Sequence, residues 1–203
     1  MDRKEFMSLT GLGTGSLISG FAPAFASRTG HDTFNNKNYK ELKADLVIAG
    51  GGVGGCAAAI AALQNNLSVI MTEETDWIGG QLTQQGVPPD EHPWIETHGS
   101  TALYRTYRTS VRDYYRNNYP LTAAARAEKY LNPGDAVVSQ LSHEPRVSLA
   151  VLQSMLMQYL SNGKLTLLLE HKISAADSDG TRVKSLTAVS KHTREVIGLT
   201  AVY

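Results

Sequence analysis

Three glycines and one acidic residue have the types and the spacing to hold a dinucleotide. Gly50, Gly52 and Gly55 follow the pattern G-x-G-x-x-G, and Glu73 closes the next apolar run. In this pattern the first glycine allows a tight turn, the second lets the backbone approach a pyrophosphate, and the third lets a helix pack closely on a strand. The acid would accept hydrogen bonds from a ribose diol. The spacing therefore predicts a nucleotide-binding site.

Backbone amides would supply the donors at this site. A helix that begins after Gly52 leaves the N–H groups of its first turn, including those of Val53 and Gly54, without intrahelical acceptors. These groups and the positive end of the helix dipole suit a diphosphate. We therefore expect the cofactor contacts at position 50 and positions 52–55.

The elements that must position these residues occur in the required order. Leu46–Ala49 is an apolar run typical of a strand, Cys56–Leu63 has the small residues of a helix packed on a sheet, and Val69–Met71 is a second apolar run. Strand, turn, helix, strand and terminal acid form the βαβ unit of dinucleotide-binding domains. The alternative is a βαβ unit with an ordinary tight turn.

A second glycine pair bears on the identity of the dinucleotide. An acid at Glu73 disfavours the 2′-phosphate of NADP, which leaves NAD and FAD. Gly79, Gly80 and Gln81 follow shortly after, and this pair would let the backbone pass close to a ligand that extends along the first unit. The pattern favours FAD. An NAD-dependent dehydrogenase is the alternative.

The longer run ETDWIGGQLTQQGVPPDEHPWIETHG, together with Ser139–Val147, resembles a bacterial family of exported FAD-dependent oxidoreductases with a glutathione-reductase-like flavoprotein fold. The resemblance covers nearly all of residues 44–203 and rests mainly on GGQLTQQGVPPDEH. It implies FAD as the cofactor and hydride transfer between a small-molecule substrate and the flavin. It also implies that Gln81 and Thr83 lie near the flavin ring or the pyrophosphate. Neither the substrate nor the electron acceptor follows from the sequence.

Other chemistry-bearing residues have simpler interpretations. Asp90 and His92 could act as general base and acid, but a proline-rich loop of this kind more often uses Asp to hold its own turn. His92 and His98 have no further ligand at usable spacing, so no metal site is expected. Cys56 is the chain's single cysteine, and we interpret it as a packing residue rather than a redox thiol.

Four arginines at positions 105, 108, 112 and 116 recur at helical spacing among tyrosines. Such a face could bind nucleic acid. We favour a solvated arginine face on a helix whose tyrosines pack inward. A third interpretation is that one or two of the arginines pair with an anionic substrate. The formal net charge of the chain is zero, so neither nucleic acid nor an anionic membrane is an expected partner.

The two ends of the chain differ from the middle. Residues 1–26 have a basic start, a short apolar stretch and an A-x-A ending, which predicts a signal peptide and an exported protein. Its start resembles a twin-arginine signal with Lys4 in place of the second arginine. Residues 27–43 are polar and read as a linker. Residues 44–203 are expected to form a partial FAD-binding domain with an inserted segment at about 75–145, and no stretch is long enough to span a membrane.

The C-terminal third predicts the rest of an α/β fold. Leucines at helical spacing over 149–160 indicate a core helix. Leu165–Glu170 reads as a third parallel strand, and Ile173–Asp177, Val183–Val189 and Glu195–Ala201 as an antiparallel meander. A sheet in the order 3-2-1-4 would then lack its fourth strand, so we expect a Rossmann-like FAD-binding βαβ unit with a meander, incomplete at the C-terminus. A non-enzymatic truncated product that binds nucleotide weakly is the remaining alternative.

Overall fold

The computed structural model describes residues 40–202 of the 203-residue chain. The predicted signal peptide and residues 27–39 of the predicted linker lie outside the described residues. Within residues 40–202, every helix is too short or too polar to cross a membrane.

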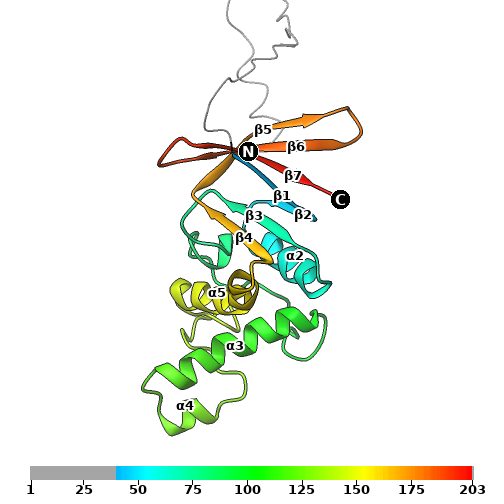
Figure 1. Ribbon diagram of the computed structural model, residues 1–203. Helices are drawn as coiled ribbons and strands as arrows, with labels where there is room; N and C mark the ends of the chain where they lie inside the picture. The colour runs from blue at the N-terminus through cyan, green and yellow to red at the C-terminus, as the bar shows by residue number, and fades with distance from the viewer. Residues whose placement is uncertain (1–39, 203) are drawn as a thin grey trace, which may run out of the picture. The chain divides into compact units, whose positions relative to one another are not determined.

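A three-stranded parallel sheet organises the described fold (Figure 1). Its strands β2 (Leu46–Ala49), β3 (Val69–Glu73) and β4 (Leu165–Leu169) are hydrogen-bonded in the order β2-β3-β4. Every residue of β3 is buried, as a central strand covered on both faces should be. The structure confirms the three predicted parallel strands and their order in the sheet. Among the described residues, β2 pairs only with β3 and forms an edge of this sheet.

Helices cover one face of the parallel sheet. α2 (Val53–Gln64) connects β2 to β3, while α3 (Ala102–Asn118), α4 (Ala123–Ala127) and α5 (Pro145–Ser161) lie between β3 and β4 in the chain. One hydrophobic cluster joins α2, α3 and α5 to alternate residues of the strands. The predicted core helix is confirmed by α5, which begins with proline and is followed by a glycine with φ of 74°, as is common at helix ends.

A second sheet covers the other face. β5 (His171–Ser178), β6 (Val183–Ser190) and β7 (Val196–Ala201) form the predicted antiparallel meander. Ile70 of β3 packs with residues of this sheet in a separate cluster, while its neighbours Val69 and Met71 belong to the helical cluster. This alternation is the two-residue period of a strand. The described fold thus has a helical layer, a parallel sheet and a meander sheet.

One strand differs from the sequence-based expectation. β1 (Lys40–Ala44) pairs in parallel with β7, with Leu42 opposite Leu199, where the sequence predicted a linker up to residue 43. Ala44 is buried and Leu42 half-buried, while Lys40, Glu41 and Lys43 are exposed. A strand this short and charged has only two inward side chains, and its partner lies at the far end of the chain. Local sequence patterns therefore did not reveal it.

Candidate functional site

The first glycine turn connects β2 to α2. Gly50 has φ of 107°, a conformation that side chains other than glycine rarely adopt. A Cβ at Gly55 would lie 2.0 Å from the carbonyl oxygen of Gly50, so this glycine permits the close contact between helix and strand. A Cβ at Gly52 would meet nothing within 4 Å. The structure thus gives these three glycines the local geometries that their spacing predicts, with open space at the middle one.

The start of α2 presents free backbone donors beside that open space. Val53 is the first helical residue, Gly52 is the N-cap, and no side chain caps the helix. The N–H groups of Val53, Gly54 and Gly55 lie in the first turn, where they have no intrahelical acceptor. Donors and helix dipole together form an arrangement suited to a phosphate group.

The second glycine turn lies directly against the first. Gly79 and Gly80 have φ of 100° and 49°, and the N–H of Gly79 donates to the carbonyl of Gly51 at 2.8 Å. A Cβ at Gly80 would lie 3.2 Å from the Cα of Gly52. Folding therefore brings together two turns that are separated by a helix and a strand in the chain. The side chain of Gln81 is exposed and makes no hydrogen bond within residues 40–202.

Glu73 ends β3 under the first turn, where its carboxylate is held by protein donors. Its Oε2 accepts from the N–H of Gly51 at 3.0 Å, and its Oε1 accepts from the N–H and the hydroxyl of Thr75 at 2.9 Å each. Only 8% of Glu73 is exposed. The carboxylate is thus fixed in orientation at the edge of the glycine turn.

Two residues of this arrangement were missed by the sequence analysis. A Cβ at Gly51 would lie 3.0 Å from the Cβ of Glu73, so the space for the acid depends on this glycine. Thr75 supplies two of the three hydrogen bonds to the carboxylate. The signal for Gly51 was the run of three consecutive glycines at 50–52. Thr75 had no signal beyond its position two residues after the acid.

Cys56 packs behind the first turn. It is 1% exposed, and its thiol donates to the carbonyl of Gly51 at 3.3 Å. Burial raises the pKa of the Cys56 thiol to about 12. A protonated, buried thiol is a poor nucleophile, so the geometry agrees with the packing role expected for this residue.

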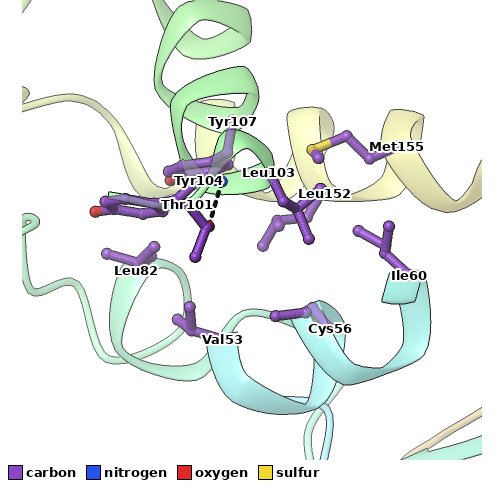
Figure 2. Close-up of a pocket in the computed structure, with 11 residues that line it drawn as sticks. Val53, Cys56, Ile60, Leu82, Thr101, Leu103, Tyr104, Tyr107, Leu152 and Met155 are labelled. Atoms are coloured by element: carbon purple, nitrogen blue, oxygen red, sulfur yellow. Dashed lines mark hydrogen bonds between the residues drawn. The ribbon is translucent and has the colours of Figure 1, made fainter. Parts of the chain in front are cut away.

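A small apolar cavity lies on the helical side of α2 (Figure 2). Val53 and Cys56 of α2 face Tyr104 of α3, Leu152 of α5 and Leu82 across a space of about 70 Å³. Pockets that hold a drug-sized ligand usually measure about 300–1,000 Å³. This cavity is therefore a gap in the packing between α2 and the helices α3 and α5, and it is not a place for a dinucleotide.

The arginines of α3 do not all form the solvated face that the sequence predicted. Arg108 and Arg112 of α3 are 1% and 3% exposed, and both form ion pairs with Glu96. Arg108 also pairs with Glu91, which accepts a hydrogen bond from Tyr104. A solvated face was wrong for these two arginines, because the loop before α3 folds back with two carboxylates that sequence periodicity could not connect to them. The inward packing of tyrosines is confirmed by Tyr107 and Tyr115, which are buried in the cluster that joins α2, α3 and α5.

Asp90 and His92 do not form an acid–base pair in the structure. Asp90 is exposed, and no hydrogen bond joins the two side chains within the described residues. The His92 ring instead lies tilted beside Trp94, with ring centroids 5.3 Å apart, and its buried Nδ1 has no hydrogen-bond partner among residues 40–202. Across residues 40–202, no group of three or more His, Cys, Asp or Glu side chains is arranged to hold a metal ion.

The comparison with protein families gives one match that covers most of the chain. A family model described as FAD dependent oxidoreductase matches residues 45–201. This segment contains both glycine turns, Glu73 and the helices α3, α4 and α5. No curated protein matches the sequence.

Comparison with solved structures gives matches at low sequence identity. Sdh1 of Mycobacterium smegmatis, solved in complex with UQ1, is 12% identical with a TM-score of 0.51, and the match covers 80% of this chain and 33% of that one. Quinol fumarate reductase of E. coli gives 16%, 0.46, 80% and 32% in the same order. L-proline dehydrogenase from P. horikoshii gives 17%, 0.41, 85% and 24%. The chain thus spans 24–33% of the length of these three structures, and the likeness to Sdh1 shows the fold alone.

Proposed function

The chain belongs to the family of FAD dependent oxidoreductases, and on that basis we propose that its two glycine turns and Glu73 form part of an FAD site in an enzyme that oxidises or reduces a small molecule. Gly50, Gly52, Val53, Gly54 and Gly55 would hold the pyrophosphate, Glu73 the ribose, and Gly79, Gly80 and Gln81 would flank the cofactor further along. The glutathione-reductase-like class is part of this proposal and is supported by the second glycine turn.

The observation that carries the proposal is the open space at Gly52. A ligand that approaches the backbone closely needs a position where no side chain stands, and a Cβ at Gly52 meets nothing within 4 Å. The free N–H groups of the first turn of α2 lie at the same place, and the fixed carboxylate of Glu73 lies below the turn. This arrangement supports a site in which the amides would hold the diphosphate and Glu73 the ribose.

The protein's part in the chemistry is to bind and orient. Bound FAD would supply a flavin N5 that exchanges a hydride with a carbon atom of the substrate. The amides at the start of α2 would bind the diphosphate. The carboxylate of Glu73, which Gly51 and Thr75 hold in one orientation, would bind the ribose. The second turn, held by the Gly79 to Gly51 hydrogen bond, would let the cofactor continue without meeting a side chain.

A substitution at Gly52 tests the site without disturbing the fold. Gly52 has φ of −62° and ψ of −175°, an extended conformation open to any residue, and an alanine Cβ there meets no protein atom within 4 Å. Gly52→Ala should therefore leave the unfolding midpoint of the apoprotein unchanged. FAD affinity, measured by quenching of flavin fluorescence, should fall by at least about tenfold, because the methyl group would stand where the ligand approaches the backbone. A tenfold loss corresponds to about 1.4 kcal/mol.

The control is Ala58→Val, which adds bulk to an exposed position of the same helix. It should leave FAD affinity unchanged. Undiminished FAD binding by Gly52→Ala would refute the assigned site. Cofactor released from purified protein should be FAD by chromatography. Release of NAD instead would favour a dehydrogenase, and a protein that binds neither would favour the non-enzymatic alternative.

Export is a further part of the proposal, and its support is the pattern of residues 1–26 described above. Bacterial cells expressing the chain should process it after Ala26 and contain it in the periplasmic fraction. Replacing Arg3 and Lys4 together with glutamine should retain the unprocessed chain in the cytoplasm. Unprocessed protein in the cytoplasm without any substitution would refute export.

A further inference from the structure

A second cavity, of about 410 Å³, lies along α3. Its walls carry the four arginines of the helix, together with Lys129 and Tyr130 from the loop after α4. Glu96 is the single acidic side chain among the lining residues. Pockets for small molecules usually measure about 300–1,000 Å³. This cavity, which we call the α3 pocket, therefore has the size of a small-molecule site.

Part of the wall is rigid and electrically balanced. Arg108 and Arg112 share the carboxylate of Glu96, and Arg108 also pairs with Glu91. The Nε of Arg112 donates to the carbonyl of Leu131 at 2.9 Å, which ties α3 to the following loop. Two buried guanidinium groups with two carboxylates leave no net charge here. These ion pairs hold the side chains on this side of the pocket in place, so ligand binding need not spend free energy on ordering them.

The remaining cations are not balanced. Arg105 donates to the carbonyl and the hydroxyl of Ser100, both of which are neutral, and it has no carboxylate partner within residues 40–202. Lys129 lies 4.8 Å from the ring centroid of Tyr130 and also lacks a carboxylate partner among the described residues. Arg116 pairs with Asp113 at 2.8 Å. The pocket therefore carries two positive charges that the described protein does not neutralise.

The imbalance is a local feature. The chain as a whole has a formal net charge of zero, so a basic composition does not explain it. The unpaired cations lie at a cavity that also presents the aromatic ring of Tyr130. The Cζ of Arg112 lies 5.8 Å from the centroid of this ring, and the Nζ of Lys129 lies 4.8 Å from it. Cations beside an aromatic ring suit a compact ligand with an anionic group and an organic body.

We propose that the α3 pocket binds a small anion that carries carboxylate or phosphate groups, with Arg105 and Lys129 as the groups that select for negative charge. The buried pairs of Arg108 and Arg112 position the wall and do not contact the ligand through a free charge. The size of the cavity favours a small molecule over a nucleic acid, whose backbone needs a groove that continues beyond one pocket. This site is independent of FAD and of the assignment of the glycine turns.

The test uses the 203-residue chain without added FAD and follows heat by titration calorimetry at low salt. The probes are malonate and inorganic phosphate, and malonamide is the neutral match for malonate. We expect saturable binding of malonate or phosphate and none of malonamide. Stronger binding of malonate would identify a carboxylate site, and stronger binding of phosphate a phosphate site. Either result supports an anion pocket.

Variants locate the binding. Arg105→Gln and Lys129→Gln each remove one exposed charge and should weaken anion binding by at least about tenfold, the usual loss for one charge-assisted hydrogen bond. Lys184→Gln removes an exposed charge from β6 and should change the affinity less than twofold. Circular dichroism on each variant checks that the fold is kept. Absence of saturable anion binding, or an equal loss in all three variants, would overturn the proposal whether or not the chain binds FAD.

Discussion

Replacing Gly55 with alanine should separate α2 from the strand that precedes it. A Cβ at this position would lie 2.0 Å from the carbonyl oxygen of Gly50 and 3.1 Å from its carbon, whereas real Cβ contacts are essentially never shorter than 3.0 Å. The helix or the turn must therefore shift by about 1 Å to accept the methyl group. The obstructing atoms are backbone, so no side chain can rotate away to relieve the contact.

The neighbouring glycine provides a matched control. Gly54 lies in the same first turn of α2, and a Cβ there meets nothing within 4 Å. Alanine at either position should gain up to about 1 kcal/mol because it reduces the entropy of the unfolded chain and favours a helix. At Gly55 this gain is opposed by an overpacking cost of about 1–3 kcal/mol. We therefore expect Gly54→Ala to stabilise the fold and Gly55→Ala to destabilise it.

Equilibrium unfolding in urea, followed by far-ultraviolet circular dichroism on the apoprotein, measures the difference. The free energies of unfolding of the two variants should differ by about 1–3 kcal/mol in favour of Gly54→Ala, with similar denaturant slopes. Because both substitutions are the same and lie side by side, effects on the unfolded chain largely cancel. A Gly55→Ala variant as stable as Gly54→Ala would refute the tight helix–strand contact and the reason given for this glycine.

Three further predictions concern the charged and sulfur-bearing residues. Glu73→Gln removes the charge from a carboxylate that accepts three protein hydrogen bonds and should weaken FAD binding by about tenfold in a fluorescence titration, as expected for loss of a charge-assisted bond of about 1.5 kcal/mol. Cys56, whose thiol pKa is raised by burial to about 12, should react with a disulfide reagent at pH 8 only after urea unfolds the chain, and rapid labelling of native protein would contradict its burial. Burial raises the pKa of Glu96, but hydrogen bonds from Arg108 and Arg112 outweigh this effect and leave the pKa below its ordinary value of 4.5. The stabilisation from the ion pairs of Glu96 should be complete above about pH 4.5 and lost as the pH falls through the lower pKa of the folded state. Glu96→Gln should therefore make the free energy of unfolding less dependent on pH in the acidic range.

The sequence predicted the elements whose signals are local. Leu46–Ala49, Val69–Met71 and Leu165–Glu170 were predicted as strands from their apolar runs, and the helix before β4 from leucines at helical spacing over 149–160. Each of these patterns lies within about a dozen residues, the range over which periodicity is informative. β1 was not predicted, because its partner β7 lies at the other end of the chain and its five residues include three charged ones.

Charge burial was the other feature that sequence periodicity could not provide. Spacing placed Arg108 and Arg112 on one face of a helix, and from spacing alone that face was expected to meet solvent. The loop that carries Glu91 and Glu96 covers it instead. A buried arginine is tolerated only where a carboxylate accompanies it, and the carboxylates come from a segment without regular structure. No periodic pattern connects the two.

What the sequence determined alone is the chemistry that follows from a missing side chain. A glycine permits a positive φ and a close backbone approach wherever it stands, so Gly50, Gly55 and Gly79 could be assigned their roles from spacing. Only the tertiary structure decided that the second glycine turn rests on the first, that Gly51 makes room for Glu73, and that two arginines are buried. These outcomes depend on contacts between segments distant in the chain, and the free energy of such contacts is set by packing in three dimensions.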